Sequence, residues 1–520
     1  MAFPIGAYSL TPNKCEEIMN YYWVLLLSGI MAYCATSVIY RKVLKVAKVR
    51  QLVDNPNERK SQKVPVPVLG GIAVYFGILC SLLFAGALVI QFGELSSMLS
   101  GKLVYSTVCD LLPVLLASSV LLLVGCMDDL VGLSPRFRLV MECCAILGMC
   151  LCSGRCVDSF HGMFGIWDFS LWIGLPLTVF AGVGIINAYN MVDGVDGLST
   201  GLCITTTPIM MAVFAKRQDW ADAALVACYF ASLIPFFIHN VFGKRSRMFI
   251  GDAGTMVMGT LFTWCVIQTL SSKGVMANLM DTDPDAVMCL PAMLLSMACV
   301  PVMDTLRVMV VRKLQGYSVF RADRNHLHHK FIDVGISPFV TTLSEIVLNL
   351  LVVLAWYVSF KMGVRQMGQL FVTLGAAVVL VWGSYFFLNN RENYNTRVLR
   401  LMREFSVVSH LERSKVWKMI QRYVDKGSYE DLTEFVLANF KGDGSSISDN
   451  DMSVVFVMNY LQDRNSANVN EIVSNLNIDP LRVSEILQEI DEHGLIEVLD
   501  RDGDGKIRKL KLRRKVIFDE

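Results

Sequence analysis

The stretch Asn187-Ala-Tyr-Asn-Met-Val-Asp-Gly-Val-Asp-Gly-Leu198 follows an apolar run, 171–186, that is long enough to form most of a membrane-spanning helix. Its two amides and two carboxylates recur every three residues, roughly along one helical face: Asn187, Asn190, Asp193 and Asp196. Gly194 and Gly197 leave room for a ligand to approach the backbone. Because carboxylates beside a bilayer are costly and usually functional, the stretch predicts a polar site at a helix end. A solvated loop with Asp-Gly turns is the alternative.

The composition of the whole chain supports a membrane setting. Of its 520 residues 54% are hydrophobic, the mean hydropathy is +0.48 and the formal net charge is +1. These values exclude an ordinary soluble globular protein and predict a polytopic membrane protein with a polar remainder. The fifteen cysteines all lie at or before Cys299, mostly inside apolar runs, where they are most simply small membrane-helix residues.

Eleven apolar segments predict an all-α polytopic membrane fold with about eleven transmembrane helices. The segments are 21–40, 68–92, 111–126, 138–152, 168–186, 201–215, 222–241, 254–272, 287–303, 342–361 and 367–389. The loops after the odd-numbered segments carry more Lys and Arg than the loops after the even-numbered ones. This asymmetry predicts that the odd-numbered loops and the C-terminus are cytosolic and that the N-terminus is outside.

Every polar cluster of the apolar region falls on an odd-numbered loop, and therefore on one predicted face. The clusters are 54–60 followed by Pro65, Pro67, Gly70 and Gly71; Asp128 and Asp129 with Arg138; the opening stretch; Asn240 with 249–254; and Asp304, Arg307 and Arg312 with 321–329. Charges that served solubility alone would appear on both faces. The one-sided placement therefore favours a functional site.

Acidic side chains at the mouth of a membrane bundle suit Mg²⁺, which prefers oxygen ligands and is usually held by one or two carboxylates plus substrate phosphates. Basic side chains near them could neutralise further phosphate charge: Lys60, Arg138, Arg307, Arg321 and Arg324. This set suits phosphoryl transfer between a soluble phosphate ester and a lipid phosphate. His326 and His329 could instead belong to a zinc site, but no Glu follows at the spacing of a zinc protease. Imidazoles that bond a sugar or a phosphate are the favoured interpretation.

Five motifs in chain order resemble those of the polyprenyl-phosphate N-acetylhexosamine-1-phosphate transferases (glycosyltransferase family 4) over about residues 20–390. They are Asp54-x-Pro-x-x-Arg59-Lys60 with Pro-x-Pro-x-x-Gly-Gly; Asp128-Asp129-Leu; Asn187-x-x-Asn-x-x-Asp-Gly-x-Asp-Gly; Phe249-x-Gly-Asp-x-Gly; and His326-Leu-His-His. The match is closest to the WecA/TagO branch. The related MraY branch ends its last motif in consecutive histidines followed closely by an acid, whereas Lys330 and Phe331 follow here.

The resemblance implies that a polyprenyl (undecaprenyl) phosphate attacks the β-phosphorus of a UDP-N-acetylhexosamine. UMP leaves, and Mg²⁺, or Mn²⁺ in its place, is required. UDP-GlcNAc is the expected donor, and the product would initiate a lipid-linked cell-surface polysaccharide at a bacterial inner membrane, with the active site cytosolic. Another UDP-N-acetylhexosamine, including the UDP-MurNAc-pentapeptide donor of MraY, is the alternative.

The resemblance also implies roles for individual residues. Asp252 and Asn190 would be Mg²⁺ ligands, and Asp193 and Asp196 would line the nucleotide site. Asp128 or Asp129 would be a base or a positioning group, so that the expected catalytic residues are Asp128, Asp129 and Asp252. The other expected substrate-binding residues are Lys60, Arg138, Asn187, Arg307, Arg321, His326, His328 and His329. Because a lipid phosphate is already anionic near neutral pH, electrostatic positioning should carry most of the catalysis. A covalent phospho-aspartate route is the alternative.

Two function classes compete with the transferase. Transporters carry ionisable residues near the bilayer midplane, often on broken helices, but here these residues gather on one face. A membrane-anchored regulator with an inactive bundle would not need the full acidic set, which is Asp128, Asp129, Asp193, Asp196 and Asp252.

The composition becomes polar after residue 389. The predicted organisation is an extracytoplasmic segment 1–20, a transmembrane transferase domain 21–389, a helical cytosolic linker 390–450 and a winged-helix-like α+β domain 451–520. The third predicted helix, 481–493, is acidic, so that DNA binding is disfavoured. A protein partner or a homo-oligomeric contact is predicted instead. The run 500–505 is similar to the start of a calcium loop, but Lys511 stands where the bidentate Glu belongs, which favours a hairpin turn.

Overall fold

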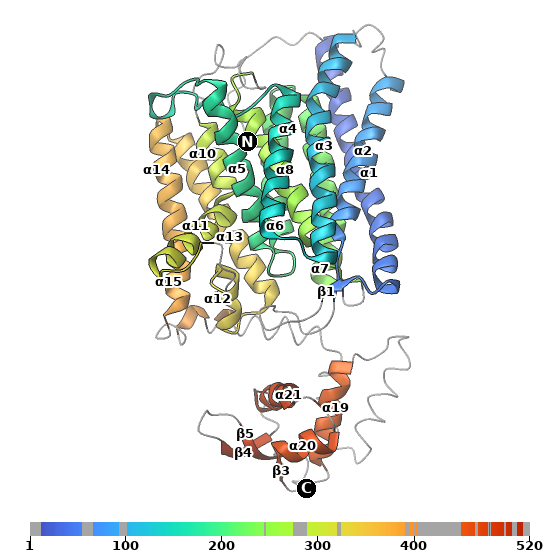
Figure 1. The fold of residues 1–520 in the computed structure, drawn as a ribbon, viewed down its shortest axis with the longest axis vertical. Coiled ribbons are helices and arrows are strands. Elements are labelled where there is room, and N and C mark those ends of the chain that lie inside the picture. Colours follow the sequence, from blue (N-terminus) through green and yellow to red (C-terminus); the bar gives the residue numbers. More distant parts are fainter. Residues whose placement is uncertain are drawn as a thin grey trace. The chain divides into compact units, whose positions relative to one another are not determined.

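The computed structural model describes residues 12–54, 66–92, 101–243, 246–273, 289–319, 324–390, 396–399, 401–402, 449–462, 466–476, 478, 480–492, 496–501 and 507–512. It divides the chain into two compact units, Met1–Arg403 and Glu404–Glu520 (Figure 1). Several sequence predictions lie outside the described residues. They are the roles of Lys60 and Arg321, half of the first motif, most of the linker and the turn of the calcium-like run.

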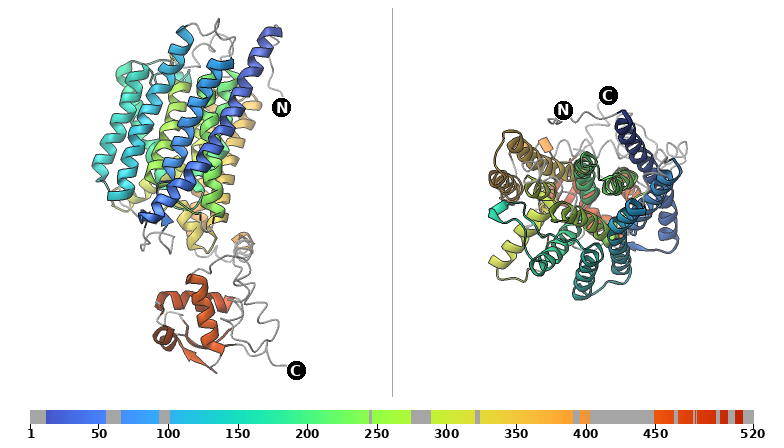
Figure 2. Two further views of the ribbon diagram at one scale, coloured as in Figure 1. Left: turned by 90° about the vertical axis from the view of Figure 1, so that its right-hand side faces the viewer. Right: turned by 90° about the horizontal axis from the view of Figure 1, so that it is seen from above.

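Helices make up the first unit and run side by side along it (Figures 1 and 2). They are α1 Pro12–Val49, α2 Gly70–Phe92, α3 Gly101–Val131, α4 Pro135–Ser153, α5 Leu171–Val192, α6 Leu198–Lys216, α7 Trp220–Phe242, α8 Gly251–Leu270, α10 Leu290–Met297, α11 Cys299–Leu314, α12 Leu327–Asp333, α13 Pro338–Lys361, α14 Gln366–Ala377 and α15 Gly383–Asn389. A π-helical segment, Val378–Trp382, joins α14 to α15. The short strands β1 Val53–Asp54 and β2 Val66–Pro67 pair antiparallel. Each apolar segment predicted from the sequence coincides with one or two of these helices.

The number of membrane spans differs from the prediction. Within the described residues, nine helices are long and apolar enough to cross a membrane, or ten if the bent pair α10 and α11 crosses as one span. Helix α4 is not among them, because Arg136, Arg138 and Glu142 reduce its apolar character. The chain is therefore a multi-pass membrane protein, and its described residues give nine or ten candidate spans where the sequence predicted about eleven.

Helix α8 is the central helix of the first unit and is buried along almost its whole length. Small residues let its neighbours approach closely, as membrane helices require when dispersion contacts drive their association. A Cβ atom on Gly71 of α2 would clash with the backbone of Gly254, and one on Gly125 of α3 would clash with the backbone of Ala253. The first turn of α8 is therefore held between α2 and α3.

We expect Gly125→Ala to lower the stability of the folded protein by about 1–3 kcal/mol, the usual cost of overpacking. The added methyl group would meet the α8 backbone, which cannot rotate away as a flexible side chain can. The matched control is Gly148→Ala on α4, where an added Cβ has nothing within 4 Å. Thermal unfolding of the two purified variants in detergent tests this. Equal melting temperatures would contradict the packing argument.

The bend between α10 and α11 is 74°, and a side chain from α13 satisfies the backbone groups that the bend leaves unpaired. Asn349 Oδ1 accepts a hydrogen bond from Val300 N at 3.0 Å, and Asn349 Nδ2 donates one to the carbonyl of Met297 at 3.2 Å. Such pairing is needed because backbone N–H and C=O groups that lie inside a membrane outside a regular helix find no water to form hydrogen bonds with.

The described residues of the second unit form three helices and a small sheet. The elements are α19 Asp449–Gln462, β3 Ala467–Asn468, α20 Val469–Leu476, α21 Pro480–Glu492, β4 Ile496–Arg501 and β5 Ile507–Leu512, with antiparallel strand order β3-β5-β4. Their core is formed by apolar side chains such as Val457, Ile472, Ile486 and Leu510. The three helices and the β4–β5 hairpin follow the order expected from the sequence, whereas β3 was not predicted, and the winged-helix assignment stays a prediction.

Candidate functional site

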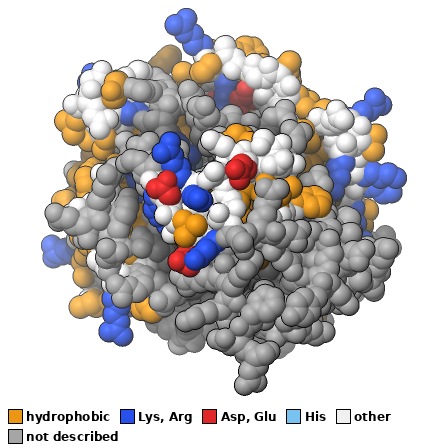
Figure 3. Space-filling model, turned by 90° about the horizontal axis from the view of Figure 1, so that it is seen from below, with side chains coloured by type: hydrophobic (Ala, Val, Ile, Leu, Met, Phe, Trp, Pro, Cys, Tyr) orange, Lys and Arg blue, Asp and Glu red, His pale blue; other side chains and the backbone are white. Residues whose placement is uncertain are grey.

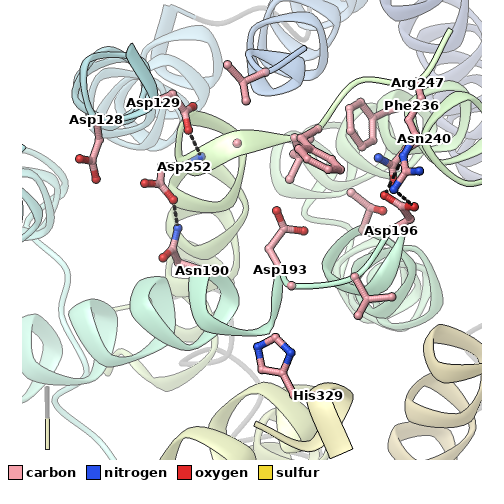
Figure 4. Close-up of a pocket in the computed structure, with 17 residues that line it drawn as sticks. Asp128, Asp129, Asn190, Asp193, Asp196, Phe236, Asn240, Arg247, Asp252 and His329 are labelled. Atoms are coloured by element: carbon pink, nitrogen blue, oxygen red, sulfur yellow. Dashed lines mark hydrogen bonds and ion pairs between the residues drawn. The ribbon is translucent and has the colours of Figure 1, made fainter. Parts of the chain in front are cut away.

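A cavity of about 450 Å³ lies at one end of the first unit, where α3 and α5 end and α8 begins (Figure 4). Its lining includes five of the predicted acids and the amide next to them: Asp128, Asp129, Asp193, Asp196, Asp252 and Asn190. His329 of α12 also lines it. The structure thus brings together four of the five motifs that are far apart in the chain. Seen from the side of α12 and β1, Lys and Arg side chains project at several points around the edge of the molecule (Figure 3).

Asp129 holds the N-terminus of α8. Its Oδ1 accepts a hydrogen bond from Asp252 N at 2.9 Å, and its Oδ2 accepts one from Ala253 N at 3.2 Å. A carboxylate is stabilised there by unpaired N–H groups and by the positive end of the helix dipole. Gly251 has φ +71° and a Cβ on it would clash with this carboxylate. The Gly-Asp pair of the fourth motif therefore fixes where Asp252 stands.

Asp252 is the acid at the centre of the described site. Asn190, in the last turn of α5, donates through Nδ2 to Asp252 Oδ1 and also to Thr255 Oγ1, the latter at 2.9 Å. Arg138 Nη1 lies 3.5 Å from Asp252 Oδ2 and 3.3 Å from Asp128 Oδ2. The Asp252 side chain is still 31% exposed, so that it remains accessible from the cavity.

The turn after α5 carries Asp193 and Asp196, which the opening stretch predicted to continue the helical face. The helix instead ends at Val192, and only the two asparagines lie on it. Ser199 donates to Asp193 Oδ1 at 2.6 Å, while burial and the charges of Asp252 and Asp196 raise the pKa of Asp193 to about 7. Asp193 lies between Asp252 and the Asp196–Arg247 pair in the lining (Figure 4).

Arg247 is a site residue that the sequence analysis missed. Its guanidinium is ion-paired with Asp196, with Nε 3.1 Å from Oδ1, and lies 5.5 Å from the ring centroid of Phe249. Phe236 and Asn240 lie beside this pair in the lining (Figure 4). The only sequence signal was a basic residue two positions before the Phe-Ile-Gly-Asp motif. This part of the cavity therefore presents aromatic rings and an ion pair rather than bare carboxylates.

The three histidines occupy different positions. His329 lines the cavity, and burial together with Arg324 lowers its pKa to about 4. His328 is buried against Gly194, where a Cβ would clash with its ring, and burial lowers its pKa as well. Both imidazoles are therefore neutral near pH 7. His326 Nδ1 lies 2.8 Å from Asp304 Oδ2 and is also buried.

Arg307 lies away from the cavity, in contrast to its expected contact with the substrate. The side chain is 1% exposed and donates to Asp304 Oδ1 at 2.5 Å and to the Asn325 carbonyl at 2.6 Å. Its guanidinium lies 3.6 Å from the ring centroid of Tyr385. Together with His326, Asp304 and Arg307 form a buried ionic group beneath the histidine motif. These contacts hold the backbone and the first histidine of the motif in place, so that Asp304 and Arg307 have a structural role here.

The donor set fits a hard divalent cation only in part. No group of three or more His, Cys, Asp or Glu side chains in the described residues is arranged to hold a metal ion. The oxygen atoms of Asp252 and its neighbours are nevertheless the type that Mg²⁺ prefers, and Mg²⁺ commonly takes its remaining ligands from substrate phosphates and water. Asn190 presents its Nδ2 to Asp252, so that ligation through Oδ1 would require the amide to turn.

Comparison with known proteins agrees with the motifs. The family model described as Glycosyl transferase family 4 matches residues 111–270. The chain is 30% identical over 328 residues to the undecaprenyl-phosphate alpha-N-acetylglucosaminyl 1-phosphate transferase of Escherichia coli K12, which covers 61% of this chain and 80% of that protein. It is 29% identical over 294 residues to the protein of the same name in Yersinia pestis, with 56% and 72% covered.

A more distant relative extends this comparison beyond the enterobacteria. Over 331 residues the chain is 25% identical to the probable undecaprenyl-phosphate N-acetylglucosaminyl 1-phosphate transferase of Bacillus subtilis strain 168, with 63% of this chain and 82% of that protein covered. These matches confirm the family expected from the five motifs. The chain is a member of glycosyltransferase family 4.

Proposed function

We propose that this chain transfers GlcNAc-1-phosphate from UDP-GlcNAc to undecaprenyl phosphate and releases UMP. The cavity carries the proposal: a group of carboxylates and an amide at one end of a membrane bundle, in a chain whose relatives bear the name of this activity. The product would initiate a lipid-linked cell-surface polysaccharide. By the distribution of Lys and Arg, the cavity and the C-terminus would face the cytosol of a bacterial inner membrane.

The cavity offers two chemically distinct regions for the two halves of the donor. We place the nucleotide beside Asp196, Arg247 and Phe249, where an aromatic ring and hydrogen-bonding groups meet. We place the diphosphate beside Asp252 and Asn190. His329, neutral at physiological pH, could then hydrogen-bond the sugar or the diphosphate without adding charge.

The reaction needs little proton transfer. An oxygen of the anionic lipid phosphate attacks the β-phosphorus, and the bond to the bridging oxygen of the α-phosphate breaks as UMP leaves with the electron pair. Asp252 and Asn190 would hold Mg²⁺, which would supply charge neutralisation at the diphosphate. Asp128 would orient the lipid phosphate, and Asp129 would act through its hold on Asp252. Most of the rate acceleration then comes from preorganised charges.

The test is UMP release by the purified full-length protein with undecaprenyl phosphate and a panel of UDP-sugars. We expect release only with UDP-GlcNAc, loss of release on chelation with EDTA, and recovery on addition of Mg²⁺. Release with another UDP-N-acetylhexosamine would keep the chemistry and replace the donor. No release with any donor would refute the proposal.

For the second unit we propose a protein-binding role in a winged-helix-like domain. Helix α21 would be the recognition helix of a DNA reader, yet acidic residues outnumber basic ones on it: Glu485, Glu489, Asp491 and Glu492 against Arg482. Such a helix would be repelled by phosphates. A partner protein or another copy of the chain is the better fit.

A further inference from the structure

Arg138 stands between the acids of the site and a buried acid that no motif contains. Its Nη1 donates to Asp128 and Asp252, as described above, while its Nε donates to Glu142 Oε1 at 3.1 Å, one helical turn along α4. Glu142 is fully buried and does not line the cavity. The guanidinium is therefore held by the site acids on one side and by Glu142 on the other.

Asn187 completes a closed ring with this pair. Arg138 Nη2 lies 3.5 Å from Asn187 Oδ1, and Asn187 Nδ2 donates to Glu142 Oε2 at 2.5 Å and to the Val183 carbonyl at 2.9 Å. Every donor in the ring Arg138–Glu142–Asn187 faces an acceptor. Asn187 therefore faces away from the cavity, whereas Asn190, one turn later on the same helix, lies in its lining.

Charge makes the members of the ring depend on one another. A buried carboxylate is costly unless it is paired and hydrogen-bonded, and Arg138 and Asn187 supply both conditions for Glu142. In return, Glu142 and Asn187 occupy the Nε and Nη2 edge of the guanidinium, which leaves Nη1 directed at Asp128 and Asp252.

We propose that Glu142 and Asn187 are positioning residues that fix Arg138 against Asp128 and Asp252. The inference rests on the proposed function, because it assigns the ring to the reaction at Asp252. Arg138 then sets the spacing and the charge of the acids at the diphosphate, in place of the free phosphate-binding role expected from the sequence.

The pattern of donors and acceptors gives a sharp test. Glu142→Gln turns one acceptor into a donor that faces Asn187 Nδ2, and Asn187→Asp turns a donor into an acceptor that faces Glu142 Oε2. Each single variant therefore breaks the ring. In the double variant the amide at position 142 donates to the carboxylate at position 187, which also accepts from Arg138 Nη2. The ring closes again with the same net charge, while the Val183 carbonyl loses its donor in both variants that change Asn187.

Each single variant should lower kcat for UMP release by about ten- to a hundredfold, the scale expected when catalytic groups are displaced by up to an ångström. KM for UDP-GlcNAc should stay within about threefold in every variant, because the ring does not line the cavity, and the double variant should recover kcat to within about threefold of wild type. Asp158→Asn, a carboxylate-to-amide change at the far end of α8, is the control and should retain the wild-type rate.

Two results would overturn the proposal: a Glu142→Gln variant at the wild-type rate, or a double variant as slow as the worse single one. Melting temperatures distinguish a failure of the ring proposal from a failure of the proposed function. If wild-type protein releases no UMP with any donor, the proposed function is refuted. The ring is then tested by comparing the melting temperatures of the wild type, the two single variants and the double variant. Melting temperatures that fall in both single variants and recover in the double variant would keep the ring, whereas additive losses would refute it.

Discussion

Asp252→Asn is expected to lower kcat for UMP release by at least about a thousandfold, at the upper end of the effect of removing one preorganised charged group. The substitution keeps the size of the side chain but removes the negative charge from the centre of the site. Asp252 is held in place by Asn190, Arg138 and the capped first turn of α8, so that no neighbouring acid can take its position. The measurement is UMP release under saturating UDP-GlcNAc, undecaprenyl phosphate and Mg²⁺.

The control for Asp252→Asn uses the other end of the same helix. Asp158 accepts hydrogen bonds from Ser272 N at 2.6 Å and Ser272 Oγ at 3.0 Å, just beyond the C-terminal end of α8. Asp158→Asn therefore makes the same chemical change far from the cavity and should leave kcat unchanged. If the Asp252→Asn protein kept a third of the wild-type rate, the Asp252 carboxylate would not be required for the reaction.

Asp304→Ala is expected to destabilise the folded protein by about 3–5 kcal/mol, the cost of breaking a buried ion pair by removing one partner. Asp304 is 1% exposed and accepts from Arg307, from His326 and from Leu327 N at 3.1 Å. Its loss removes the ion-pair partner of the buried guanidinium and the acceptor for Leu327 N at the start of α12. Since α12 carries His328 and His329, UMP release should fall as well. Thermal unfolding and activity of the same preparation test both parts.

A second acid in the same region provides the comparison. Asp333 pairs with Arg324 at 3.1 Å, but both side chains are more than a third exposed. An exposed pair contributes about 0–1 kcal/mol, so that Asp333→Ala should barely change the melting temperature. Equal losses for the two variants would mean that burial of the Asp304 pair does not determine its contribution.

The sequence predicted the helices because long apolar runs leave a chain few alternatives in a bilayer. It also predicted which acids lie close together, since the polar motifs all fell on odd-numbered loops and therefore on one face of the membrane. It could not assign directions to side chains at the ends of those runs. Asn187 and Asn190 have the same spacing pattern and the same chemistry, yet one faces a buried ring and the other the cavity. The difference is set by α4 and α8, which pack against α5 from distant parts of the chain.

Three further differences have the same cause. Arg307 looked like a phosphate-binding residue because it is basic and close to the histidine motif, but its partner Asp304 lies one turn away on the same buried face. Glu142 lies inside the predicted apolar segment 138–152, and its role depends on two partners, Arg138 and Asn187. Arg247 carries no motif signature. In each case the deciding contact is a pair of charges. Two of these pairs lie one turn apart on a single helix, but the sequence does not show that neighbouring helices enclose them, and the Arg247–Asp196 pair joins segments that are far apart in the chain.

The burial of α8 has a consequence for how the protein is made. Of the nine candidate spans, α8 is the least apolar, and lipid is kept from it by its neighbours. A segment with this composition gains little from entering the bilayer alone. Its insertion therefore depends on α2, α3 and α5, which precede it during synthesis and offer the glycine surfaces that receive it. The same small residues that bring Asp252 into the site thus also help the growing chain to retain α8, its seventh candidate span, and the helices that follow.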